Sequence, residues 1–148
     1  MTVSKSLRVV QTPRPNLFHC GFALKLITAM YRPPAVPELD PQELARKLRS
    51  AEDFVLLDVR EAWELALTHL DDPRLVHLPL SRLARQRNAA FPQDLLEPDR
   101  EIVVICHHGV RSAQVTAWML EQGWRRVSSL AGGLDAYARS VDPSTGLY

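Results

Sequence analysis

The sequence contains little cysteine. Cys20 and Cys106 are the only two cysteines among 148 residues, which excludes a framework of several disulfides and fits a reducing compartment such as the cytoplasm. No Cys-x-x-Cys pair occurs, and His107 and His108 are adjacent rather than spaced as zinc ligands usually are. We therefore expect neither a metal ion nor another cofactor.

An excess of charge of either sign is also absent. The 18 Lys and Arg residues nearly balance 17 acids, and the formal net charge of +1 gives no electrostatic reason to expect a nucleic-acid or membrane partner. Hydrophobic residues make up 46% of the chain, which is usual for a soluble globular protein. A chain of 148 residues is long enough for one domain with a buried core.

The first part of the chain differs from the rest. An apolar stretch over residues 17–31 is interrupted by His19 and Lys25, so it is too short and too polar to span a membrane. No clean signal-peptide cleavage site follows it. We expect residues 1–35 to form an N-terminal arm, either packed on the domain or partly disordered, and residues 36–148 to form the domain.

Beyond the arm, apolar runs of strand length alternate with segments of helical composition. The strongest runs cover residues 54–57 and 102–105, and weaker ones cover 75–78 and 127–130. Continuous apolar runs are typical of parallel strands that are buried on both faces. The alternation predicts an α/β fold, with a parallel sheet covered by helices on both sides.

Several helix boundaries are also predicted. Asp40 is expected to cap a helix, with Pro41 at its first position and Glu43 reaching back to the cap. Trp63 is expected to anchor a helix over residues 61–67 in the core. A helix over 82–90 is expected to be capped by Ser81 and to expose Arg82, Arg85 and Arg87. A further helix is expected to bury Ala113, Thr116, Ala117 and Leu120 and to end at Gly123. A last helix is expected to open at Gly132 and Gly133.

The strand over residues 102–105 leads directly into Cys106-His107-His108-Gly109-Val110-Arg111-Ser112, after which a helical pattern begins. In a loop that opens a helix, backbone N–H groups converge on an anion and the helix dipole adds partial positive charge. The same field favours a thiolate, so Cys106 is expected to be reactive. The alternative is an inert cysteine buried at the end of a strand, and a resolving role for Cys20 toward Cys106 is a weaker hypothesis.

The other loop residues each have two interpretations. Arg111 either attracts an anionic donor or braces the loop by pairing with an acid. His107 and His108 either tune the thiol and move protons or simply fill the loop. Gly109 is expected to supply a positive φ or a close approach, and Ser112 either caps the helix or bonds the thiolate.

A second polar motif follows the strand over residues 54–57. Because the carboxyl ends of parallel strands meet at one rim of a sheet, Asp58 and Arg60 are expected to lie on the same rim as Cys106. Their role is either structural support, as an ion pair or a cap, or direct participation in the chemistry.

Three segments together resemble the single-domain rhodanese family: residues 58–61 with Glu64, residues 106–112, and residues 130–137. The resemblance covers roughly residues 36–147, with the motifs in the family's order and spacing. It implies a three-layer α/β/α fold with a central five-stranded parallel sheet. It also implies that Cys106 carries sulfane sulfur as a persulfide. The surrounding loop would bind the sulfur, with Arg111 catalytic and His107, His108, Gly109, Val110 and Ser112 around the substrate.

The function expected from this resemblance is that of a thiosulfate sulfurtransferase-like enzyme. A small anionic donor such as thiosulfate would give sulfur to Cys106, and a thiol or protein acceptor would take it. One alternative is a phosphatase or arsenate reductase of the same fold, but that loop has five residues between the cysteine and the arginine, whereas Cys106 and Arg111 are separated by four. A second alternative is a non-catalytic rhodanese-like interaction module, although such modules often lack the cysteine.

Overall fold

The computed structural model describes residues 35–148. The expected N-terminal arm, with Cys20, therefore lies outside the described residues except for Ala35. The described part contains one five-stranded sheet in which all pairings are parallel, as predicted. The strands follow the order β1-β5-β4-β2-β3 across the sheet, with bounds β1 Glu38–Leu39, β2 Val55–Asp58, β3 Leu75–His77, β4 Ile102–Ile105 and β5 Val127–Leu130.

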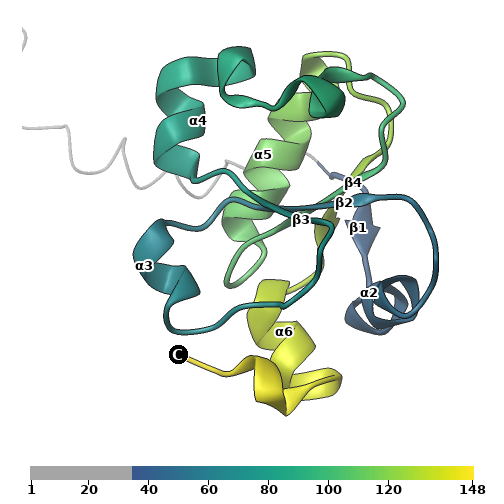
Figure 1. The fold of residues 1–148 in the computed structure, drawn as a ribbon, viewed down its shortest axis with the longest axis vertical. Coiled ribbons are helices and arrows are strands. Elements are labelled where there is room, and N and C mark those ends of the chain that lie inside the picture. Colours follow the sequence, from purple (N-terminus) through teal and green to yellow (C-terminus); the bar gives the residue numbers. More distant parts are fainter. Residues whose placement is uncertain (1–34) are drawn as a thin grey trace, which may run out of the picture. The chain divides into compact units, whose positions relative to one another are not determined.

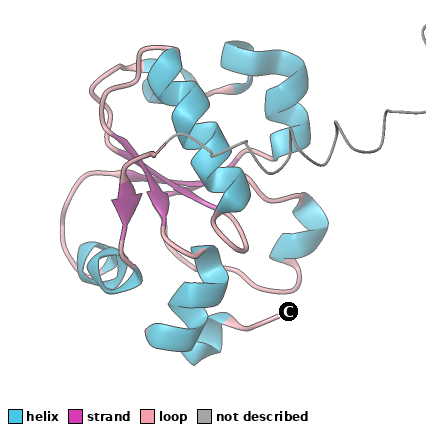
Figure 2. Cartoon of the chain, turned by 180° about the vertical axis from the view of Figure 1, so that it is seen from behind, coloured by secondary structure: helices cyan, strands magenta, loops and turns pink. Residues whose placement is uncertain are grey.

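Helices cover both faces of this sheet (Figures 1 and 2). On one face α4 and α5 pack against a core that contains Val55 and Leu57, and on the other α2 and α6 pack against Leu56. Consecutive residues of a strand point to opposite faces of the sheet. Because both faces are covered by helices, every residue of the central strands β2 and β4 is buried, which explains the continuous apolar runs in the sequence. The helices are α2 Pro41–Leu48, α3 Ala62–Leu65, α4 Leu80–Gln86, α5 Val110–Glu121 and α6 Gly133–Ser140.

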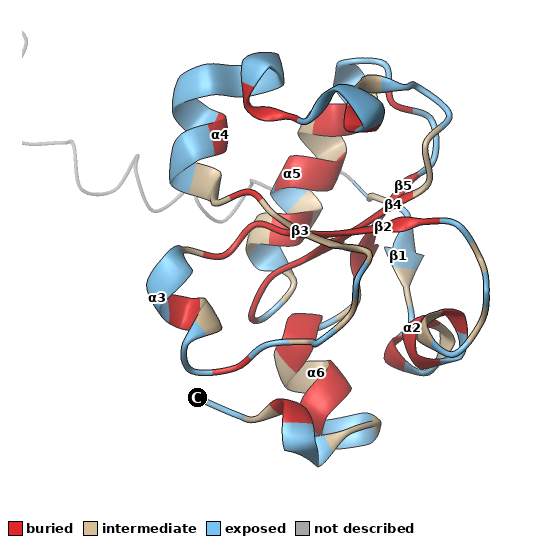
Figure 3. Cartoon of the chain, viewed as in Figure 1, coloured by how far each residue is buried: buried red, intermediate tan, exposed pale blue. Residues whose placement is uncertain are grey.

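The central strands are the most deeply buried part of the described chain (Figure 3). All four residues of β2 and all four of β4 are buried, whereas the outer side of α4 is exposed. Three short 3-10 segments complete the described part: η2 Arg87–Ala90, η3 Gln93–Leu96 and η4 Pro143–Thr145. Within residues 35–148, each helix falls short of the length and apolar character needed to cross a membrane.

The start of α2 agrees with its prediction in two of three respects. The Asp40 carboxylate accepts a hydrogen bond from the Gln42 N–H at 2.8 Å, and Pro41 occupies the first turn. Glu43 does not reach back to the cap; it pairs with Arg46 at 2.8 Å. A nearby arginine one turn along the helix is a better partner for this exposed carboxylate than the backbone.

One predicted helix face was wrong and another was only partly right. Trp63 does not anchor α3 in the core, because its side chain is 65% exposed. The capping box formed by Glu61 and Glu64 fixes the phase of α3 instead, and it places Glu64 on the buried side. In α5 the buried residues are Ser112, Val115, Thr116 and Met119. Thr116 is buried as expected, whereas Ala113, Ala117 and Leu120 are only partly buried.

The boundaries of α4 also differ from the prediction. The helix begins at Leu80 with Pro79 as its N-cap, so Ser81 lies in its first turn and does not cap it. The Ser81 hydroxyl instead donates to Glu61 Oε2 at 2.8 Å. Two boundary glycines were predicted correctly: Gly123 follows α5 with φ +107°, and Gly132 is the N-cap of α6.

Candidate active site

Cys106 lies at the carboxyl edge of the sheet, directly after β4. Asp58 at the end of β2 pairs in register with Ile105, and the Val59 N–H donates to the Ile105 carbonyl at 3.1 Å. The structure therefore brings the Asp58 motif and Cys106 to the same rim, as expected from parallel strands. Cys106 is only 1% exposed, so its sulfur lies at the base of the loop rather than on the surface.

Three polar groups surround the Cys106 sulfur. The backbone N–H groups of Gly109 and Ser112 donate to Sγ at 3.1 and 3.3 Å, and the Ser112 hydroxyl lies 3.3 Å from the same atom. The positive φ of Gly109, +86°, turns the loop so that these groups converge. Such a concave arrangement of N–H groups at the start of a 12-residue helix stabilises negative charge on the enclosed atom.

Ser112 contacts the sulfur and does not cap the helix, since the N-cap of α5 is Gly109. The Ser112 hydroxyl also lies 2.8 Å from the hydroxyl of Ser129, a fully buried residue of β5. The Ser112 hydroxyl also lies 3.2 Å from the Gly109 carbonyl, so when Ser129 donates to Ser112, the Ser112 proton has two possible acceptors, this carbonyl and the sulfur. A buried pair of hydroxyls thus supports the loop from the sheet side.

Arg111 is paired with an acid on α3. Its two terminal nitrogens donate to the two carboxylate oxygens of Glu64 at 2.7 and 2.6 Å. Glu64 is 3% exposed, and the Tyr148 hydroxyl donates to it at 2.9 Å. The hydrogen bonds from Arg111 are the main reason that the pKa of Glu64 falls to about 2. This geometry is the loop brace considered from the sequence, and it balances the arginine's charge.

The Glu64–Arg111 pair predicts a pH-dependent stability. Because the folded-state pKa of Glu64 is depressed from 4.5 to about 2, its charged form stabilises the fold by about 3 kcal/mol above pH 4.5. That contribution is lost as the pH falls from 4.5 to about 2. The free energy of unfolding, measured with urea, should therefore differ between wild type and Glu64→Gln at neutral pH, and the difference should shrink in this acidic range.

The exposed Glu97 provides a matched control. Glu97→Gln removes a carboxylate of the same kind without breaking a buried contact, and it should change the free energy of unfolding by less than about 0.5 kcal/mol. A Glu64→Gln difference that stays constant down to the lowest pH at which the protein folds would show that Glu64 is not held ionised by Arg111.

The two histidines of the loop occupy different surroundings. His107 is 8% exposed, and its ring lies between those of His108 and Tyr148, with centroid separations of 3.8 and 4.0 Å. Burial, with a smaller contribution from His108, lowers the pKa of His107, so its imidazole is neutral at neutral pH. His108 is exposed.

Asp58 and Arg60 form a fully buried ion pair. Arg60 Nε lies 3.0 Å from Asp58 Oδ1, and Nη2 lies 2.7 Å from Oδ2, so the contact is bidentate. The remaining terminal nitrogen of Arg60 donates to the Thr68 hydroxyl at 2.8 Å. The pair's hydrogen bonds are directed into the protein, an arrangement that suits structural support of the rim.

The first turn of α6 is clamped onto the Cys106 loop. The N–H groups of Leu134 and Asp135 donate to the carbonyls of Cys106 and His107 at 2.9 and 3.0 Å. Gly133 allows this approach: a Cβ there would lie 2.6 Å from the Cys106 carbonyl oxygen and closer still to that of His107. Its φ of +65° adds a second reason for glycine.

We expect Gly133→Ala to damage both the fold and the site. The added methyl group must push α6 away from the loop, and the positive φ strains any L-residue, so the free energy of unfolding should fall by more than about 2 kcal/mol. Gly123→Ala is the matched control, because its φ is +107° but a Cβ there meets nothing within 4 Å. Urea unfolding and a sulfur-transfer assay on both variants check the prediction: only Gly133→Ala should lose activity, and equal losses would contradict the clamp.

Several contacts of this site were not predicted from the sequence, including that of Gly133, which was expected only to open the last helix. Ser129 supports the loop from β5, Gly133 permits the close approach of α6, and Tyr148 covers both His107 and Glu64. Glu64 was noted only as part of a motif. The sole local signal for it was the Glu61–Glu64 spacing of a capping box, which fixes the helix phase and so directs Glu64 inward.

Comparison with known proteins gives a consistent result. Residues 40–140 match the model of the rhodanese-like domain family. The chain is 36% identical over 104 residues to a protein named sulfurtransferase from Allochromatium vinosum, covering 70% of this chain and 90% of that protein. It is 31% identical to the thiosulfate sulfurtransferase GlpE of Haemophilus influenzae, covering 72% of this chain and 91% of that protein.

Solved structures agree with the fold. A rhodanese-related protein from Thermoplasma volcanium superposes with a TM-score of 0.57 and 25% identity, covering 71% of this chain and 93% of that one. Other curated relatives are longer: the chain spans 42% of a plant protein from Arabidopsis thaliana and 50% of a protein from Bacillus subtilis. The shared region is therefore a module that occurs both nearly alone and within larger proteins.

Proposed function

The chain belongs to the rhodanese-like family of sulfurtransferases, and from this premise we propose that Cys106 carries sulfane sulfur as a persulfide between a donor such as thiosulfate and a thiophilic acceptor. The main support for the proposal is the set of hydrogen-bonding groups around the Cys106 sulfur. Two backbone N–H groups and one hydroxyl lie within 3.3 Å of the Cys106 sulfur, at the start of α5.

In the first step the Cys106 thiolate attacks the outer sulfur of thiosulfate. A new S–S bond forms to Cys106, the S–S bond of thiosulfate breaks, and its electron pair leaves with sulfite. The N–H groups of Gly109 and Ser112 contact the sulfur that is negatively charged before the attack. Hydrogen-bond donors fixed in place before reaction stabilise such charge without reorganising.

In the second step a nucleophile takes the outer sulfur from the persulfide. Cyanide in an assay, or a thiol of a small molecule or protein, attacks that sulfur and regenerates the Cys106 thiolate. Donor and acceptor react in turn with the same sulfur atom of the enzyme, so ping-pong kinetics are expected.

The Glu64–Arg111 pair determines which groups of the loop attract an anionic sulfur donor. Both terminal nitrogens of Arg111 are engaged by a buried carboxylate, so the pair as a whole brings no net charge to the loop. The backbone N–H groups and the helix N-terminus then become the main source of positive potential at the sulfur. Arg111 contributes chiefly by holding the loop in shape, and its contribution to binding an anionic donor is secondary.

The burial of Cys106 restricts the shape of both reactants. A sulfur that belongs to a residue only 1% exposed is reached by a narrow group with a terminal sulfur, rather than by a bulky one. Thiosulfate and the persulfides of small molecules or protein cysteines have this shape. We assign to the chain a small anionic sulfur donor and a thiol or protein acceptor, acting in the cytoplasm.

Phosphate or arsenate chemistry is the second candidate because it uses a similar loop. Against it, only four residues separate Cys106 from Arg111, and the loop N–H groups already lie within hydrogen-bonding distance of the sulfur itself. A non-catalytic interaction module is the third candidate, but this chain retains the cysteine and the groups that surround it.

Steady-state kinetics distinguish the three candidates. Thiocyanate formation from thiosulfate and cyanide should give parallel double-reciprocal lines, and glutathione persulfide and mercaptopyruvate should be compared as donors. Hydrolysis of an aryl phosphate without sulfur transfer would favour the phosphatase. Absence of both reactions would favour the interaction module.

A further inference from the structure

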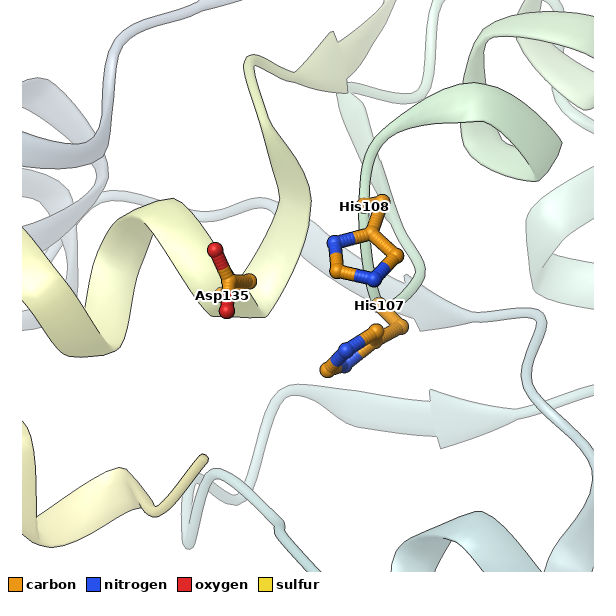
Figure 4. A group of neighbouring side chains, drawn as sticks. All are labelled: His107, His108 and Asp135. Atoms are coloured by element: carbon orange, nitrogen blue, oxygen red, sulfur yellow. The ribbon is translucent and has the colours of Figure 1, made fainter. Parts of the chain in front are cut away.

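A second cluster of chemically capable side chains lies beside the sulfur loop. Figure 4 shows His107 and His108 on the loop after β4, facing Asp135 on the first turn of α6. Each residue offers one ligand atom, and these atoms lie within 4.8 Å of one another. This group is not apparent from the sequence, because 27 positions separate His108 from Asp135 and the two histidines lack a spacing typical of zinc sites.

His107, one residue of the cluster, has a buried ring nitrogen without a partner in the described part of the chain. His107 Nδ1 is buried and makes no hydrogen bond within residues 35–148, although the ring is more than nine-tenths buried. Leaving a polar atom buried without a partner destabilises the folded state. Most buried polar atoms do have partners, and an exception often marks an absent ion or water. The geometry therefore points to a ligand at His107.

The scaffold under the cluster is already fixed. The backbone hydrogen bonds from α6 to the Cys106 and His107 carbonyls, together with the absence of a Cβ at Gly133, hold the loop and the helix turn together. His108 is exposed and Asp135 half-buried, so their side chains can still rotate. Ligand atoms of a tetrahedral ion with bonds of about 2.0–2.1 Å lie about 3.3–3.4 Å apart. Side-chain rotation therefore has to shorten the separations, which are now within 4.8 Å, by up to about 1.4 Å.

We propose that His107, His108 and Asp135 bind a divalent transition-metal ion such as Zn²⁺. Two imidazoles and one carboxylate are a ligand set that suits zinc. Magnesium and calcium prefer oxygen ligands, which this cluster offers only through Asp135. With three protein ligands the ion keeps an open position, and it would sit one residue from the proposed sulfur carrier.

Arg139 provides an internal test of the site. Its guanidinium binds the Asp135 carboxylate at 2.9 and 3.2 Å from the next turn of α6. A cation on this carboxylate competes with a metal ion for the same oxygens. Removing Arg139 should therefore strengthen metal binding, whereas removing Asp135 should weaken it. A variant that merely loosened α6 would weaken binding in both cases.

Isothermal titration calorimetry tests the proposal: the full chain is first freed of metal with a chelator and is then titrated with Zn²⁺ alone. Zinc affinity should fall by at least about tenfold in His108→Ala and in Asp135→Asn, and it should rise in Arg139→Gln. His69→Ala, which removes an exposed histidine elsewhere, should leave the affinity unchanged. Binding of Co²⁺ should give the visible absorption of a nitrogen- and oxygen-ligated ion.

Three results would overturn the proposal. The first is a wild-type chain that binds no zinc. The second is zinc affinity that is unchanged by both His108→Ala and Asp135→Asn, because the ion would then lie elsewhere, for example at His19 and Cys20. The third is zinc binding that disappears in Cys106→Ser, because the thiol would then be the principal ligand. The proposal is supported if Cys106→Ser keeps its zinc affinity while His108→Ala and Asp135→Asn lose affinity and Arg139→Gln gains it.

Discussion

Cys106→Ser is expected to reduce sulfur transfer from thiosulfate to cyanide by at least about a thousandfold. The serine hydroxyl fits the same space and keeps a hydrogen-bonding atom beside the N–H groups of Gly109 and Ser112. A hydroxyl without an adjacent general base is nevertheless a weak nucleophile at neutral pH, and oxygen does not carry sulfane sulfur reversibly. The turnover number should therefore collapse while the fold remains.

The other cysteine provides the matched control. Cys20→Ser removes the only other thiol of the chain, and it should leave the rate of sulfur transfer within about twofold of wild type if Cys106 acts alone. Circular dichroism and urea unfolding of both variants confirm that the fold is retained. Substantial activity in Cys106→Ser, or loss of activity in Cys20→Ser, would contradict the assignment of the sulfur carrier to Cys106.

Arg60→Met is expected to cause the largest loss of stability among single substitutions at the rim. Arg60 and Asp58 are both completely buried, and their contact is bidentate. Removing the arginine leaves a buried carboxylate without its counter-charge, which costs about 3–5 kcal/mol in the free energy of unfolding. The Thr68 hydroxyl also loses its partner.

A double-mutant cycle isolates the charge effect. In Asp58→Leu combined with Arg60→Met both charges are absent, so the double variant should be more stable than the sum of the two single losses predicts, by at least about 1 kcal/mol. Arg125→Met is the matched surface control: its partner Asp99 and Arg125 itself are both exposed, and solvent screening should keep the loss of stability there far smaller than in Arg60→Met. Equal losses in urea unfolding for Arg60→Met and Arg125→Met would show that the buried pair is not important for stability.

The sheet was predictable because its signal is local. Continuous apolar runs at 54–57 and 102–105 gave the two central strands to within one residue, and the motif after each run gave the rim on which Cys106 lies. The boundary glycines were predictable for the same reason, since a positive φ at the edge of a helix strongly favours glycine, after α5 at Gly123 and before α6 at Gly132. Local chemistry thus defined the strands, the loop and their shared edge.

The features that were not predicted depend on contacts between distant parts of the chain. Glu64 and Arg111 are 47 positions apart, and nothing near either residue identifies the other as its partner. The phase of α3 follows from its capping box, so the largest apolar residue in that segment, Trp63, points outward. Gly133 is explained only when α6 is placed against the Cys106 carbonyl.

The mass of the intact protein after incubation with a sulfane donor tests the central claim most directly. Wild type treated with thiosulfate, or with glutathione persulfide, should gain the mass of one sulfur atom, located on the peptide that contains Cys106. Cyanide should remove this sulfur as thiocyanate, and Cys106→Ser should show no gain. Failure of the wild type to gain sulfur from every donor tried, or a sulfur adduct located on a residue other than Cys106, would contradict the account.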